Sequence, residues 1–182
     1  MWGRDAGVRS ADWRAVFTIF LFHAGFGFAQ TSNLGDEPKI SVLGRLDPDL
    51  ILAVNAVVPK AAQKMEASEC QAVFSDFKDA AGRTLLQVLE TKGQTGAGYL
   101  KWLIFLNGSD DQFCLNSNIV AGTNPGDRFV RICGPRFKSI ARTDPGYGAT
   151  VVIHELLHSL GLPENPPSSR AIARQVVHRC GR

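Results

Sequence analysis

The sequence predicts an α+β domain, and the order of its local patterns supports this class. Apolar residues at helical spacing recur between residues 47 and 89. Short aromatic and β-branched runs, bounded by turn residues, follow between 99 and 132, and helical patterns return after residue 150. Helices followed by strands, rather than a regular alternation, are typical of this class. We therefore expect N-terminal helices, a small, mainly antiparallel sheet, a central helix and a C-terminal helix.

The N-terminal helices are predicted from caps and breakers. Asp47 and Pro48 suit the N-cap and first position of a helix that runs through Val58. Pro59 should kink or end that helix. Further helical pieces are expected at 60–65, 68–77 and 84–89.

Three strands are expected at 99–106, 119–121 and 129–132. The last two flank Asn124-Pro125-Gly126-Asp127, a sequence that favours a turn, and so predict a hairpin. The loop Asp144–Gly148 should precede the central helix, and a final helix is expected at 168–178. Residues 30–46 have the composition of an irregular arm.

The central helix carries a candidate metal site. His154 and His158 are four residues apart, so both imidazoles leave one helical face. Glu155 can deprotonate a water beside them. Gly161 can end the helix in a left-handed conformation, after which Glu164 can return as a third ligand. Two imidazoles and one carboxylate leave a Zn²⁺ ion one open position for water.

The chemistry needs these residue types. Zn²⁺ lowers the pKa of a bound water towards about 7, and a carboxylate at 155 can take the proton and pass it to the leaving amine. The flanking residues Val151–Ile153, Leu156, Leu157 and Leu160 are apolar nearly all round the helix. Burying two imidazoles and a carboxylate there is costly without partners. The alternative is an ordinary buried helix with satisfied histidines.

The stretch His154–Glu164 resembles the active-site helix of zincin metallopeptidases, in the extended metzincin form HExxHxxGxx(H/D/E). The resemblance implies a zincin-like fold, His154, His158 and Glu164 as zinc ligands, Glu155 as general base, and a sheet edge beside the substrate cleft. Metzincins also carry a methionine turn after the metal helix. This chain has only Met1 and Met65, both upstream.

Two other residues are candidates for the site. His178, on the last expected helix, is the alternative third ligand to Glu164. No glutamate follows position 164, and this absence favours Glu164 over a later carboxylate. Tyr147, just before the metal helix, could donate a hydrogen bond to the oxyanion formed during hydrolysis. Its alternative role is packing at the start of the helix.

Residues 1–29 resemble a secretory signal peptide. Arg4, Arg9 and Arg14 precede an apolar run from Ala15 to Ala29. Cleavage would leave residues 30–182 as a single secreted or periplasmic domain. The alternative is an uncleaved membrane anchor. After cleavage no membrane association is expected, because no second long apolar run occurs.

The four cysteines, Cys70, Cys114, Cys133 and Cys180, are an even number, which in an exported chain favours two disulfides. We prefer the pairs Cys114–Cys133 and Cys70–Cys180 among the possible connectivities. The alternative is four reduced thiols in a cytosolic protein.

Charge excludes one class of partner. The chain has 20 Lys and Arg against 17 Asp and Glu and no basic cluster interleaved with aromatic residues, so no nucleic-acid partner is expected.

The expected protein is a monomeric, secreted, zinc-dependent metallopeptidase that acts on a peptide or protein. The alternatives are a non-catalytic zincin-like binding domain and a zinc amidase acting on cell-wall peptides.

Overall fold

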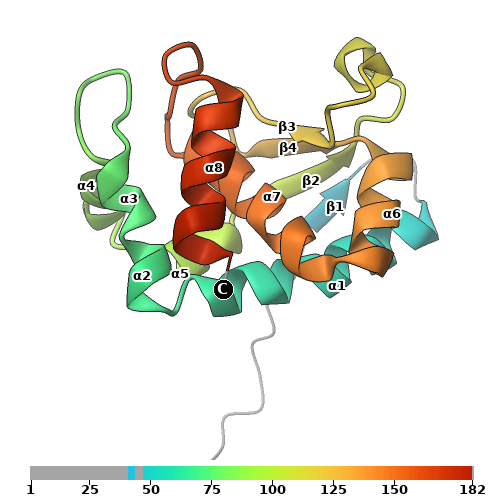
Figure 1. Ribbon diagram of the computed structural model, residues 1–182, viewed down its shortest axis with the longest axis horizontal. Coiled ribbons are helices and arrows are strands. Elements are labelled where there is room, and N and C mark those ends of the chain that lie inside the picture. Colours follow the sequence, from blue (N-terminus) through green and yellow to red (C-terminus); the bar gives the residue numbers. More distant parts are fainter. Residues whose placement is uncertain (1–40, 44–46, 182) are drawn as a thin grey trace, which may run out of the picture. The chain divides into compact units, whose positions relative to one another are not determined.

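The computed structural model describes residues 41–43 and 47–181, all of which belong to one compact unit, and confirms a mixed α+β domain (Figure 1). The expected signal peptide, residues 1–29, lies outside the described residues. The helices are α1 (Pro48–Lys64), α2 (Ser68–Gln71), α3 (Val73–Asp76), α4 (Leu85–Thr91), α5 (Gly96–Leu100), α6 (Gly134–Thr143), α7 (Pro145–Ser159) and α8 (Ser169–Cys180), with a 3-10 turn η1 (Gln112–Leu115). The strands are β1 (Ser41–Leu43), β2 (Ile104–Asn107), β3 (Ala121–Gly122) and β4 (Phe129–Ile132).

The sheet has the strand order β1-β2-β4-β3. β2 is parallel to both β1 and β4, and only β3 pairs antiparallel, with β4. The expectation of a mainly antiparallel sheet was therefore wrong, although the β3–β4 hairpin is confirmed. The long connection between β2 and β4 permits parallel pairing, because parallel neighbours need a crossover. β1 also places residues 41–43 of the expected irregular arm in the sheet.

The expected strand at 99–106 is half helix. α5 begins after Thr95, whose hydroxyl accepts a hydrogen bond from the N–H of Gly98, and β2 starts only at Ile104. Tyr99 and Leu100 are buried in the core from helical positions. Their apolar character reflects burial rather than strand geometry.

Pro59 does not end α1, which runs without interruption to Lys64. Asp47 caps this helix, because its carboxylate accepts hydrogen bonds from the N–H groups of Asp49 and Leu50. Pro59 removes a helical hydrogen bond to the carbonyl of Asn55, and both residues lie on the exposed face. Solvent can therefore satisfy the released carbonyl.

α7 is the central helix of the domain. It packs against α1, α6 and α8, and in Figure 1 it lies between α6 and α8 on one side of the sheet. The expected loop Asp144–Gly148 is in fact its first turn: Asp144 is the N-cap and Pro145 the first helical residue. The preceding helix, α6, was not predicted from the sequence.

Both preferred disulfides are confirmed, and no described cysteine is free. Cys70–Cys180 joins α2 to the end of α8, and Cys114–Cys133 joins η1 to the residue before α6. Within the described residues, no helix combines the length and apolar character needed to cross a membrane.

Candidate active site

His154 and His158 converge as their spacing predicts. Both lie on α7, and their Nε2 atoms are 3.1 Å apart, with the ring planes tilted by 60°. A tetrahedral zinc ion bound at about 2.0–2.1 Å to each nitrogen would separate them by roughly 3.4 Å. The two imidazoles therefore fit a shared divalent ion with little movement.

The turn after α7 sets the proton arrangement of His158. Gly161 has φ +105° and ends the helix, as predicted, so that the carbonyl of Leu162 comes within 2.9 Å of the Nδ1 atom of His158. Because a carbonyl only accepts, Nδ1 carries a proton and donates a hydrogen bond to Leu162, and Nε2 is the nitrogen directed at His154. Metal-binding histidines are commonly oriented by such a second hydrogen bond.

Burial also prepares His154 to bind a cation. Burial away from solvent is the main cause that lowers the pKa of His154 to about 4, and the neighbouring His158 is the second cause. Its imidazole is therefore neutral at physiological pH. A histidine must be neutral to bind a metal ion.

Glu155 lies beside the two histidines and is almost fully buried, with 5% of its surface exposed. Its Oε2 atom has no hydrogen-bond partner. Burial, and to a smaller extent the nearby Glu164, raises the pKa of Glu155 to about 8, while the Thr123 hydroxyl opposes this shift. A buried carboxyl group without a partner is costly, and such groups are common at functional sites.

These groups open into a cavity of about 710 Å³. Its walls come from η1 and the loop after it, from β3 and the β3–β4 turn, from one face of α7, and from α8. Strand β3 pairs only with β4, so among the described strands its second edge has no neighbour. The residues that line the cavity include Phe113, Gly122, Thr123, Tyr147, His154, Glu155, His158, Glu164, Ala173 and Val177.

The structure brings Glu164 to the cavity but does not complete a metal site. Within residues 41–43 and 47–181, no three His, Cys, Asp or Glu side chains converge closely enough to hold an ion. Glu164 is exposed in the loop after α7 and makes no hydrogen bond or ion pair that would fix its carboxylate. Of the three expected ligands, the structure brings together only the two histidines, and the third ligand stays a prediction.

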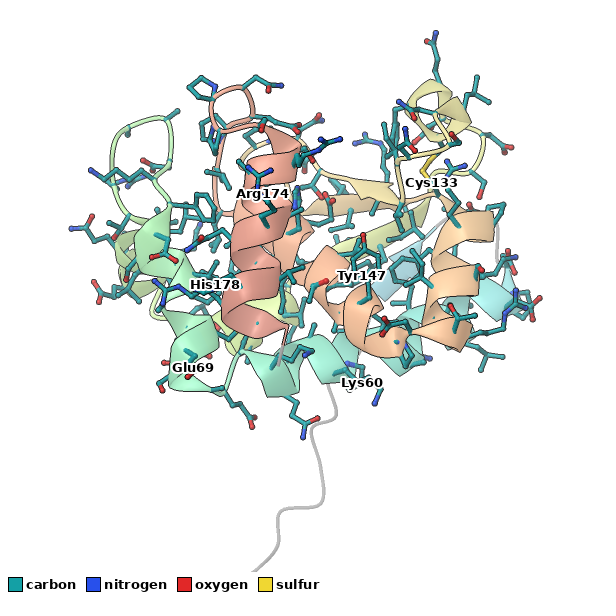
Figure 2. The ribbon with its side chains drawn as sticks, viewed as in Figure 1. Lys60, Glu69, Cys133, Tyr147, Arg174 and His178 are labelled. Atoms are coloured by element: carbon teal, nitrogen blue, oxygen red, sulfur yellow. A yellow bond between two sulfur atoms is a disulfide. The ribbon has the colours of Figure 1, made fainter. Side chains whose placement is uncertain are left out.

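The structure separates the other two candidates. His178 does not line the cavity; it lies on the exposed face of α8, near Asp76, whose pKa is lowered mainly by its hydrogen bond with Arg179 and least by His178. Tyr147 does line it: Figure 2 shows this half-exposed side chain projecting from the start of α7 between α8 and α6. Its role as an oxyanion donor stays a prediction.

Sequence reasoning missed the contribution of the β3–β4 turn. Thr123 lines the cavity, and the N–H of Gly126 bonds to the carbonyl of His158 at 2.9 Å. The turn residues 124–127 were recognisable, but nothing in the sequence indicated that this turn packs against the histidine helix.

No protein-family model, curated protein or solved structure matches the chain. The case for function therefore depends on the geometry of the site.

Proposed function

We propose that the chain is a secreted zinc-dependent metallopeptidase in which His154 and His158 hold the metal and Glu155 is the general base. The observation that carries the proposal is the arrangement of these side chains. Two imidazoles face one point, and a buried carboxyl group whose Oε2 atom has no partner lies next to them at the cavity. Two disulfides agree with an oxidising compartment.

Zinc, when bound here, would supply a Lewis acid that polarises a substrate carbonyl and acidifies a water molecule. The chain supplies the rest. Glu155 accepts the proton of the attacking water through Oε2 and returns it to the leaving amine. The apolar residues around α7 keep bulk water away from this carboxylate, and Glu164 is the proposed third ligand on the same cavity.

A peptide is the substrate that the cavity suits best. An extended peptide can add to the free edge of a sheet through main-chain hydrogen bonds, and β3 presents such an edge beside Glu155. This feature favours an extended peptide substrate over the amide of a cell-wall peptide.

The second candidate is a non-catalytic zincin-like domain that binds a partner. The observation that favours it is the missing convergence of three ligands among the described residues. Such a domain would leave the cavity free for a peptide but would bind zinc weakly.

The test compares the full chain, exported so that its disulfides form, with Glu155→Gln and with Glu66→Gln as a matched surface control. Glu66 is exposed and is not among the residues that line the cavity. We expect the wild type and Glu66→Gln to cleave members of a peptide library. Glu155→Gln should keep its zinc and lose at least about 100-fold in kcat/KM.

The other outcomes are informative. Equal activity of Glu155→Gln would remove Glu155 from the mechanism. No hydrolysis of any peptide, even with excess zinc, would support the binding domain, and cleavage of cell-wall peptides alone would support the amidase.

A further inference from the structure

Thr123 shares an unusual property with Glu155. In the part of the chain that the structure describes, only the Thr123 Oγ1 and the Glu155 Oε2 are buried side-chain polar atoms without a hydrogen-bond partner. Both residues line the same cavity. An unpaired buried polar atom costs about 1–3 kcal/mol, so two of them on one cavity indicate a polar ligand that both can contact.

The two groups also interact with each other at short range. The Thr123 hydroxyl faces the Glu155 carboxyl group closely enough to lower its pKa, as a hydrogen-bonding group would, yet neither Thr123 Oγ1 nor Glu155 Oε2 reaches a partner at ordinary hydrogen-bond geometry. Both oxygens are therefore available to one small polar molecule in the cavity. A buried water commonly satisfies two or more such polar groups.

Thr150 shows that the threonine hydroxyls of this cavity are not all without a hydrogen-bond partner. Thr150 also lines it, but its Oγ1 donates a 2.7 Å hydrogen bond to the carbonyl of Tyr147 within α7. The Thr123 hydroxyl, which follows the two-residue strand β3, is free to bind a ligand.

The turn that carries Thr123 is attached to the helix that carries Glu155. Gly126 donates its N–H to the carbonyl of His158, and Asp127 donates its N–H to the carbonyl of Asn124 at 3.0 Å. On the other side, Gly122 is in register with Arg131 of β4. These contacts fix the position of Thr123 relative to Glu155.

We propose that Thr123 Oγ1 and Glu155 Oε2 bind one water molecule, and that this is the water that attacks the substrate. The water donates one hydrogen to Oε2 and the other to Oγ1, which directs its oxygen lone pairs towards the scissile carbonyl. Its role in hydrolysis rests on the proposed function, whereas the water site itself does not.

The step balances as follows for a peptide. Glu155 takes the first proton while the water oxygen forms a bond to the carbonyl carbon. The C–N bond then breaks, and Glu155 gives that proton to the departing nitrogen. The second hydrogen stays on the new carboxyl product, so Thr123 orients the water without losing or gaining a proton.

The experiment has a structural and a kinetic readout. Crystal structures of the metal-free wild type, Thr123→Ser and Thr123→Val, at a resolution that shows ordered water, test the site. We expect one water within hydrogen-bonding distance of both oxygens in the wild type and in Thr123→Ser. Thr123→Val, which has nearly the same shape but no hydroxyl, should lose that water.

For the kinetics, Thr123→Val should lower kcat by roughly three- to tenfold, the value of one hydrogen bond, with KM changed less than about twofold. Thr123→Ser should restore the rate. The matched control is Thr143→Val, because the Thr143 hydroxyl bonds only to Ser139 at the exposed end of α6.

Two results would overturn the inference: a direct Thr123–Glu155 hydrogen bond with no water between them, or a shared water whose loss in Thr123→Val leaves kcat unchanged. If the wild type hydrolyses nothing, the proposed function fails and the catalytic role fails with it. The crystal structures would still decide whether the shared water site exists.

Discussion

The backbone N–H of Gly126 donates a 2.9 Å hydrogen bond to the carbonyl oxygen of His158. This contact joins the β3–β4 turn, on one wall of the cavity, to the helix that carries both candidate imidazoles. Gly126 adopts φ +81°, a conformation that residues with a β-carbon disfavour. The geometry of the site therefore depends on a glycine outside the HExxH segment.

Replacing Gly126 by alanine should separate backbone strain from function. A β-carbon at Gly126 would meet no atom within 4 Å, and Gly82, in a distant turn, has nearly the same φ of +80° and equally open surroundings. Each glycine-to-alanine variant should lose about 1 kcal/mol of unfolding free energy in urea. Only Gly126→Ala should also lower hydrolysis. Equal activity in the two variants would show that the turn does not position the site.

The two disulfides should differ in what their removal does. Cys70 and Cys180 are 110 residues apart, whereas Cys114 and Cys133 are 19 apart. In the loop-entropy model, replacing both cysteines of the longer loop by serine costs about 1.5 kcal/mol more stability. Urea denaturation of the two double variants measures this difference.

Loss of the shorter loop should instead affect the cavity. Cys114–Cys133 holds the segment 111–122, which supplies a whole wall, and Arg136 reinforces it by donating to the carbonyls of Cys114 and Ile119. For the same loss of stability, this double variant should lose more activity than the variant without Cys70–Cys180. The reverse ranking would mean that the wall keeps its shape without the disulfide.

The stability of the metal-free protein should depend on Glu155. Burial raises the pKa of this carboxyl from 4.5 to about 8, so between these values the folded state binds more protons than the unfolded state. Stability from this group is present at low pH and falls as the pH rises through that window. A glutamine at position 155 does not titrate, so its contribution to stability does not change with pH in that window.

Glu155→Gln should therefore be more stable than the wild type, and the difference should grow by more than about 1 kcal/mol between pH 5 and pH 7.5. Chemical denaturation after removal of metal, with Glu66→Gln as the control, measures the difference. A constant difference across this range would show that the carboxyl titrates normally.

Helices α1 and α7 and the β3–β4 turn were accessible from the sequence because their signals are local. Asp47 before Pro48, the turn at 124–127 and the apolar pattern around His154 each act within a few residues, and each element was found. Disulfide pairing followed from the even count together with the positions of the cysteines relative to the expected elements.

The missed features depend on contacts distant in the sequence. Parallel pairing of β2 with β4 is decided by the crossover between them, and the helical state of Tyr99 by its burial against Ser159, to which its hydroxyl bonds. Likewise, the HExxH spacing predicted the paired imidazoles. It could not reveal Thr123, which lines the cavity from a turn that is hydrogen-bonded to α7.

The central claim is that His154 and His158 hold a zinc ion. Elemental analysis of the purified full chain tests it most directly, using the double variant His154→Ala/His158→Ala and the control His178→Ala, which alters the alternative ligand. We expect about one zinc per chain in the wild type and in His178→Ala, and less than about a tenth of that in the double variant. A wild type without zinc, or a double variant with undiminished zinc, would contradict the claim.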